Sequence, residues 1–209
     1  MTPTRKAALV ADAAVIVLLA AMIGCNNPMT LTPSPLDPKD KPSFDRPLPK
    51  LAKPRIVVHK SARVLTVYDG RRVVKKYRCC SGINSGDKDR EGDRKTPLGD
   101  FFVCYKNPKS NYTLSLGLNY PNEEDAARGL QSGLITQAQH DELVAATRGR
   151  TLDAATWERL WKTPLGGEIM IHGAGADRRG TAGCVGMDDD DIRELYPAIP
   201  LGTPVTIKP

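Results

Sequence analysis

From residue 55 onward the chain is a series of short apolar runs separated by turn-forming residues. Each run has the length of a strand, and the Asp69-Gly70 pair between two of them is typical of a tight β-hairpin turn. Because strand follows strand with turn signals between them, the pattern predicts a mainly β domain with mostly antiparallel pairing. The predicted strands are residues 55–59, 63–68, 73–80, 100–105, 117–120, 168–172 and 204–208.

Between residues 121 and 166 the pattern changes from strand-like to helical. Thr136 can cap a helix over residues 137–147, whose apolar positions fall on one face. Thr151 or Asp153 can start a second helix that carries two tryptophans. We interpret residues 121–166 as a helical insert between two strands.

A further short helix is predicted after the acidic run at residues 188–191. Asp188 is placed to cap it, and the following carboxylates would lie at the positive end of the helix dipole. The helix is expected to stop before Pro197. Calcium binding is the alternative for this run, but the glycine and the distal Glu of a calcium loop are missing.

The N-terminus has the layout of an export signal. Arg5 and Lys6 precede an apolar run over residues 7–23, which only Asp12 interrupts. The run ends in Gly24-Cys25 and resembles the cleavage site of bacterial lipoproteins, where the cysteine receives a lipid. An uncleaved anchor helix is the alternative, since short apolar runs are ambiguous.

These features predict the domain organisation. Residues 1–24 would be a lipoprotein-type signal peptide, and Cys25 would carry the lipid. Residues 25–54 are rich in proline and should form an extended tether, followed by one domain at residues 55–209. The protein would then be exported, periplasmic and lipid-anchored to a bacterial membrane.

Composition excludes several classes of function. The net charge of +6 is spread among acids, and aromatic residues make up only 5%, which argues against nucleic-acid binding. No cysteines have zinc-like spacing and the chain has only 3 His, so no metal site is expected. Cys79 or Cys80 could form a disulfide with Cys104, or these thiols could be free and buried. Nothing indicates an oligomer, and a monomer is the default expectation.

Two segments carry candidate chemistry. His172 ends an apolar run and is followed by Gly173, and twelve residues later Cys184 follows Gly183. A thiol needs a neighbouring base to become a strong nucleophile, and His172 is the histidine nearest in sequence. We expect His172 to take the thiol proton and pair with the thiolate, while the N–H groups of Gly183 and Cys184 stabilise an oxyanion.

In context, these residues resemble the L,D-transpeptidase family with its YkuD-type catalytic domain. The matching pieces are Thr96-Pro97-Leu98-Gly99, Ile171-His172-Gly173 and Thr181-Ala182-Gly183-Cys184-Val185. Residues 115–122, with Asp125 after them, resemble the YafK-like branch. The resemblance covers about residues 55–208.

The resemblance implies a β-sandwich-like catalytic domain with a helical insert and a short helix after the catalytic cysteine. Cys184 would attack the carbonyl after the third residue of a peptidoglycan stem peptide and form a thioester. His172 would be the base, oriented by a backbone carbonyl that we assign to Gly173. An amine of a second stem, an amine of a lipoprotein, or water would take the acyl group, with no cofactor.

The sequence also departs from the family pattern. Many members carry a histidine where this chain has Ala182, and Arg or Asn where it has Gly186. The task of holding a substrate carboxylate would then fall to Arg178 and Arg179, as charge-assisted donors, together with Thr181. The alternative is that these arginines are solvated loop residues.

The leading hypothesis is a peptidoglycan L,D-transpeptidase that acts in cell wall crosslinking or remodelling. A hydrolase on the same scaffold, which cuts a meso-diaminopimelate amide such as a link between a lipoprotein and the wall, is the second. A non-catalytic wall-binding lipoprotein is the third. A papain-like protease is excluded because in that class the catalytic cysteine precedes the histidine, whereas in this chain His172 precedes Cys184.

Overall fold

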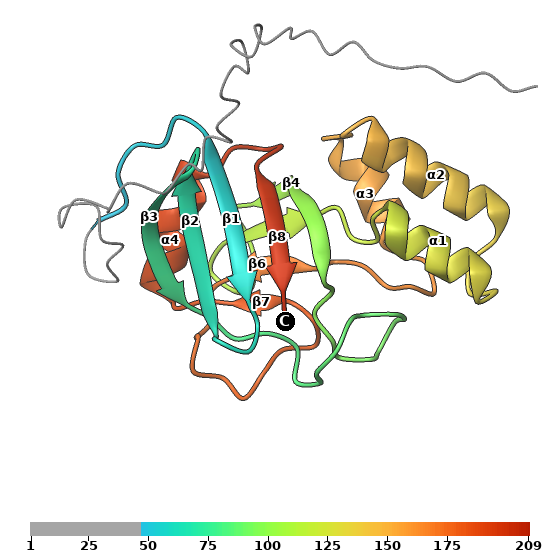
Figure 1. The fold of residues 1–209 in the computed structure, drawn as a ribbon, viewed down its shortest axis with the longest axis horizontal. Helices are drawn as coiled ribbons and strands as arrows, with labels where there is room; N and C mark the ends of the chain where they lie inside the picture. Colours follow the sequence, from blue (N-terminus) through green and yellow to red (C-terminus); the bar gives the residue numbers. More distant parts are fainter. Residues whose placement is uncertain (1–46) are drawn as a thin grey trace, which may run out of the picture. The chain divides into compact units, whose positions relative to one another are not determined.

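The computed structural model describes residues 47–209. The predicted signal peptide, the lipid site at Cys25 and most of the tether lie outside the described residues. Within them the chain forms eight strands and four helices (Figure 1). The strands are β1 Pro54–His59, β2 Val64–Asp69, β3 Arg72–Arg78, β4 Gly99–Asn107, β5 Ser115–Leu118, β6 Met170–His172, β7 Val185–Gly186 and β8 Pro204–Lys208.

The strands form one sheet in the order β3-β2-β1-β8-β4-β5-β6-β7. Neighbours are antiparallel except for the pairs β1–β8 and β6–β7, which are parallel. Ile56 of β1 and Ile171 of β6 belong to one core although three strands separate them in the sheet, so the sheet curls around that core. The predicted mainly β fold is confirmed, and only the two-residue strand β7 was not predicted.

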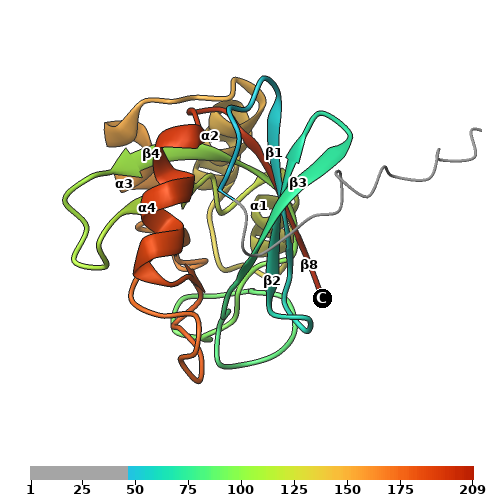
Figure 2. The same cartoon turned by 90° about the vertical axis from the view of Figure 1, so that its left-hand side faces the viewer.

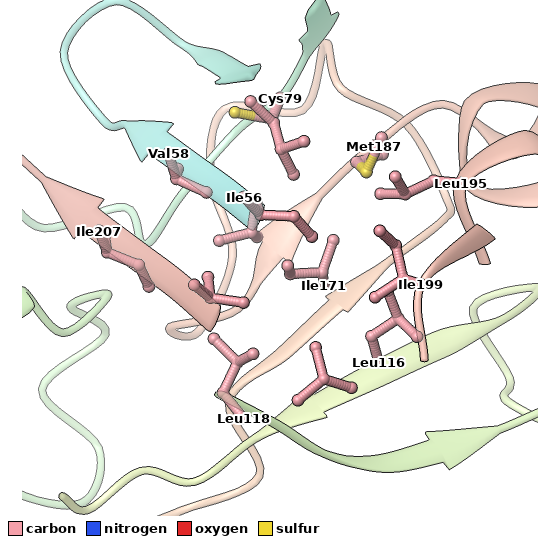
Figure 3. Close-up of a cluster of buried hydrophobic side chains, with 14 of the residues drawn as sticks. Ile56, Val58, Cys79, Leu116, Leu118, Ile171, Met187, Leu195, Ile199 and Ile207 are labelled. Atoms are coloured by element: carbon pink, nitrogen blue, oxygen red, sulfur yellow. The ribbon is translucent and has the colours of Figure 1, made fainter. Parts of the chain in front are cut away.

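Strand β4 separates two cores because both of its faces are buried. Phe101 and Val103 face the larger core, which lies inside the curled sheet and also receives α4 (Figures 2 and 3). Phe102 and Cys104 face the opposite way, into a second cluster formed with the helical insert. This double burial explains why the sequence of β4 is continuously apolar rather than alternating.

The helical insert consists of α1 Glu123–Gln131, α2 Gln137–Arg148 and α3 Ala154–Leu160, which gather beside β4 (Figure 1). Caps at Thr136 and Asp153 start α2 and α3, as predicted. Helix α1 was missed, although the sequence carries its signal. Asn122 and Asp125 form a capping box, in which each side chain accepts from the other residue's backbone N–H.

Helix α4, Asp189–Ala198, follows the acidic run but differs from the prediction at both ends. Asp188 is the N-cap residue, yet its side chain makes no capping hydrogen bond and instead accepts from the N–H of Ala176. The helix also continues through Pro197. The ammonium of Lys106 donates to the carbonyls of Tyr196 and Ile199 and thereby satisfies the end of the helix.

The domain begins before residue 55. Leu48 and Leu51 pack against the larger core, and the N–H of Leu48 donates to Glu194 Oε1 at 2.6 Å. The last residues of the predicted tether therefore belong to the domain, because they bury apolar side chains that an extended tether would expose.

Two arrangements were expected for Cys79, Cys80 and Cys104, a disulfide or free buried thiols. The structure has the second, because all three thiols are free and buried. Cys79 lies in the larger core and Cys104 in the cluster on the other side of β4, so the sheet separates them. Among residues 47–209, no helix combines the length and apolar character that crossing a membrane requires.

The larger core should dominate stability. Leu116 is fully buried in it, whereas Leu152 is 44% exposed. We expect Leu116→Ala to lower the free energy of unfolding by about 2–5 kcal/mol. Leu152→Ala, the matched control, should change it by less than about 0.5 kcal/mol. Urea unfolding followed by circular dichroism measures both free energies. Equal losses of unfolding free energy in the two variants would contradict the dominant role of the larger core.

Candidate active site

The parallel pairing of β6 with β7 places Cys184 and His172 on one face of the sheet. Ile171 pairs with Val185, and both side chains point into the larger core. Because strand side chains alternate, His172 points to the opposite face, and so does Cys184 immediately before Val185. The two side chains are therefore diagonal neighbours across adjacent strands.

The sulfur of Cys184 is half-buried and held by two backbone groups. Sγ accepts from the N–H of Met170 and donates to the carbonyl of Glu168, both at 3.4 Å. Glu168 has a left-handed backbone with φ of 53° just before β6. In this structure the Cys184 thiol therefore donates to the Glu168 carbonyl.

The imidazole of His172 is oriented by its neighbour. Its Nδ1 lies 2.6 Å from the carbonyl oxygen of Gly173. Since a carbonyl can only accept, Nδ1 carries the proton and Nε2 of the neutral ring is left as the base. Tyr112 packs on the ring with 4.6 Å between centroids. A Cβ at Gly173 would lie 2.5 Å from Asp189 Oδ1, so this position needs glycine.

Two cavities meet at these side chains. One, here called the arginine cavity, measures about 320 Å³ and is lined by Arg94 and Arg178. The other, called the lysine cavity, measures about 430 Å³ and is lined by Lys88. Tyr112, His172, Ala182 and Cys184 line both cavities. The sulfur and the imidazole thus face space that a ligand can enter from two sides.

The electrostatics favour a neutral pair at rest. Burial raises the pKa of the Cys184 thiol to about 11, an effect that the Met170 N–H opposes and the charge of Glu168 reinforces. Burial also lowers the pKa of His172, against the hydrogen bond to Gly173. Burial therefore opposes the expected pair of thiolate and imidazolium, because both charged forms lose solvation here.

Two threonine hydroxyls brace the turn that carries the nucleophile. The fully buried Thr96 donates from Oγ1 to the Gly183 carbonyl at 2.7 Å and accepts from the N–H of Gly82 at 2.7 Å. Thr181 donates from Oγ1 to the Cys184 carbonyl at 2.6 Å and accepts from the Gly183 N–H at 3.1 Å. These bonds fix the backbone on both sides of the sulfur.

These hydrogen bonds involve two residues that the sequence assigned to the site. The N–H of Gly183 donates to the Thr181 hydroxyl, so it is already used in this structure. Thr181, expected to bind substrate, lines the arginine cavity, and its hydroxyl also donates to the Cys184 carbonyl. Among the hydrogen bonds between described residues, none uses the N–H of Cys184, which leaves it as the remaining donor of the expected pair.

The two arginines predicted to bind a substrate carboxylate differ in their position. Arg178 lines the arginine cavity, and its charge contributes to the lowered pKa of His172. Arg179 is exposed and lines neither cavity. A Cβ at Gly186 would lie 2.8 Å from Cys80 Sγ, so Cys80 fills the space that a larger side chain at that position would need.

Sequence reasoning missed several residues at this site. Tyr112 and Lys88 come from loops, where no hydrophobic period points to a role, and Glu168, predicted to begin a strand, lies just before β6. Arg94 has a left-handed backbone with φ of 57°, which also leaves no signal in the sequence. Within residues 47–209, no group of His, Cys, Asp and Glu is placed to hold a metal ion.

The family model of the YkuD L,D-transpeptidase catalytic domain matches residues 53–207. A sequence search of curated proteins finds no match.

Solved structures of similar fold were also found. The helical cell shape determining protein Pgp2 from Campylobacter jejuni is 23% identical over 75% of this chain and 47% of its own, with a TM-score of 0.50. Bd1075 of Bdellovibrio bacteriovorus is 25% identical over 76% of this chain and 48% of its own, with a TM-score of 0.47. The chain therefore spans about half the length of these proteins.

The resting thiol should react as a thiol of high pKa. We expect the rate of Cys184 alkylation by iodoacetamide to rise about tenfold per pH unit from neutral pH up to about pH 10, because only the thiolate reacts. Intact-mass spectrometry measures the rate, and Cys184→Ser identifies the site. A rate that levels off below about pH 8 would contradict a neutral resting thiol.

The hydroxyl of Thr96 should position the nucleophile turn. Thr96→Val removes the donor to Gly183 and the acceptor for Gly82 in a buried place, at a cost of about 1–3 kcal/mol. Alkylation of Cys184 should then change in rate, because its turn loosens. Thr96→Ser keeps the hydroxyl and should retain both the stability and the alkylation rate. Equal stability and equal alkylation rates in Thr96→Val and Thr96→Ser would contradict this role.

Proposed function

Because this chain belongs to the YkuD family of L,D-transpeptidase catalytic domains, we propose that it is a peptidoglycan L,D-transpeptidase that uses Cys184 as its nucleophile. The observation that carries the proposal is the shared placement of Cys184 and His172. Both line the same two cavities, and the Gly173 carbonyl leaves Nε2 of His172 unprotonated.

In the first step the thiol proton passes to Nε2 of His172 as the sulfur attacks the carbonyl carbon after the third residue of a stem peptide. The negative charge moves to the carbonyl oxygen, where the N–H of Cys184 is placed to donate. The protonated imidazole then gives its proton to the departing amine of the terminal D-amino acid. A thioester on Cys184 remains.

In the second step an amine of another stem attacks the thioester, His172 takes its proton, and the sulfur leaves as the thiol. Two cavities that meet at one sulfur support transfer, since a donor in one leaves the other open for an acceptor. The raised thiol pKa supports attack that is coupled to proton transfer rather than a preformed thiolate.

Hydrolysis of a diaminopimelate amide, with water as the acceptor, is the second candidate. The resemblance to the YafK-like branch supports it, but the residues that carry this resemblance have structural tasks. Asn119 accepts from the N–H of Phe102, and Asn122 with Asp125 caps α1. The third candidate, a wall-binding lipoprotein without catalysis, would have no use for an oriented base beside an accessible thiol.

We further propose that the enzyme is exported and held at a bacterial membrane through a lipid on Cys25. Its work would then be periplasmic crosslinking or remodelling of the wall, with peptidoglycan stems as substrates and a wall-linked lipoprotein as a further partner. The fold similarity to a protein described as determining helical cell shape is compatible with a role in cell shape.

The activity is tested with purified tetrapeptide-bearing muropeptides and mass spectrometry. We expect crosslinked dimers and released terminal D-amino acid from the wild type and neither from Cys184→Ala, because that change removes the attacking sulfur. Cys104→Ala, which removes a buried thiol that lines neither cavity, should keep the activity.

Other products would identify the alternatives. Shortened monomers without dimers would indicate hydrolysis, and no change in the muropeptides would favour the wall-binding protein. Turnover that survives in Cys184→Ala would refute the assigned nucleophile.

A further inference from the structure

Two chain segments hold the imidazole of His172 from different sides. The Gly173 carbonyl accepts its Nδ1–H at 2.6 Å, and the ring of Tyr112 packs on it with 4.6 Å between centroids. The two segments also bind each other, because the Gly173 N–H donates to the carbonyls of Tyr112 at 3.0 Å and Leu114 at 3.4 Å. The orientation of the base therefore depends on both segments together.

Each segment contains one residue that has a left-handed backbone and is not glycine. Thr113 has a φ of 70°, and Ala174 has a φ of 73°. A left-handed backbone is rare for residues with a side chain, and rarest for β-branched residues such as threonine. Such a backbone persists only where neighbouring groups hold it in place. The two turns beside the base therefore need contacts that keep them in this conformation.

Asp189, at the start of α4, contacts both turns through a single oxygen atom. Its Oδ1 accepts from the hydroxyl of Thr113 at 2.7 Å and from the N–H of Ala174 at 2.8 Å. The Ala174 N–H, with a further contribution from the Thr113 hydroxyl, lowers the pKa of Asp189, so the carboxylate is ionised at neutral pH. Hydrogen bonds to an ionised acceptor are stronger than those to a neutral one. Asp189 thus joins α4 to both segments that orient His172.

We propose that Asp189 is a positioning residue for the base: by locking the two left-handed turns, it holds His172 in the tautomer that carries its proton on Nδ1. The effect on turnover rests on the proposed function, whereas the tautomer depends on no substrate. Asp189 lines neither cavity, so it acts through the base and not on the substrate. If the turns relaxed, the Gly173 carbonyl would move away from Nδ1 and the proton could settle on Nε2. The ring could then no longer accept the proton of Cys184.

A role in the helix alone does not account for these contacts. Asp189 lies in the first turn of α4 together with Asp190 and Asp191, where all three carboxylates suit the positive end of the helix dipole. The side chain of Asp190, however, is 99% exposed and pairs with Arg193 on the same helix. Asp190→Ala therefore removes one charge from the same helix turn without touching the base, and it is the matched control for Asp189→Ala.

The tautomer of His172 is read by NMR from long-range correlations of the imidazole nitrogens in isotope-labelled protein, with His172→Gln identifying the signals. Because burial lowers the pKa of His172, the ring is neutral at about pH 8. We expect the proton on Nδ1 in the wild type, in Asp190→Ala and in Asp189→Asn, whose amide oxygen can still accept both bonds. In Asp189→Ala part of the population should carry the proton on Nε2, which moves the two nitrogen signals towards each other.

Turnover gives a second measurement. Release of D-alanine from a tetrapeptide donor in a single turnover, followed over a range of donor concentrations, separates the rate constant of acylation from the affinity for the donor. We expect Asp189→Ala to lower the rate constant roughly tenfold to a hundredfold, with the affinity within about twofold, because a small displacement of a catalytic group slows a reaction that much. Asp189→Asn should recover most of the rate constant, and Asp190→Ala should keep it.

A wild-type tautomer in a folded Asp189→Ala protein would overturn the inference, and so would a loss of donor affinity in place of a lower rate constant. Circular dichroism checks the fold of this variant. If it does not fold, Thr113→Ala removes one of the two bonds to Oδ1 and is judged by the same two measurements.

The two measurements also separate this inference from the proposed function. A shifted tautomer in Asp189→Ala, without D-alanine release from the wild type, would keep the positioning role and remove the proposed function. Release of D-alanine by the wild type, with the same tautomer in every variant, would remove the positioning role and leave the transpeptidase intact.

Discussion

The chemistry of this domain depends on the parallel pairing of two very short strands, β6 and β7. Their register joins Ile171 to Val185 in the core and so turns His172 and Cys184 to the other face. A shift by one residue would bury the reactive side chains and expose the apolar ones. The core that surrounds Ile171 therefore stabilises the arrangement of the active site as well as the fold.

The nucleophile turn is held by hydroxyl groups rather than by apolar packing. Thr96 reaches it from the loop before β4, and Thr181 from within the turn. Both hydroxyls satisfy backbone groups, so they fix the sulfur without occupying the space in front of it. Burial raises the pKa of the Cys184 thiol, an effect that the Met170 N–H opposes and the charge of Glu168 reinforces. In the proposed mechanism the thiol is therefore activated as its proton passes to His172.

The surroundings of the sulfur differ on its two sides. Guanidinium groups line one cavity, while a buried ammonium and two carboxylates line the other. The buried pair of Lys88 and Asp93 is costly to desolvate and is satisfied by backbone N–H groups and a carbonyl.

The sequence by itself determined the elements with strong periodicity or caps: seven strands, the helices capped by Thr136 and Asp153, and the helix after the acidic run. It also singled out Cys184 and His172, because a reactive thiol needs a base, while the role of the Gly173 carbonyl followed from the resemblance to the L,D-transpeptidase family. Only the tertiary structure decided the rest. Three examples join residues that lie far apart in the sequence or within loops. Thr181 uses the N–H of Gly183, Cys80 fills the space at Gly186, and Lys88 lines one cavity with Cys184. Local patterns record the propensity of a segment, whereas these contacts arise from the way the curled sheet brings separate loops together.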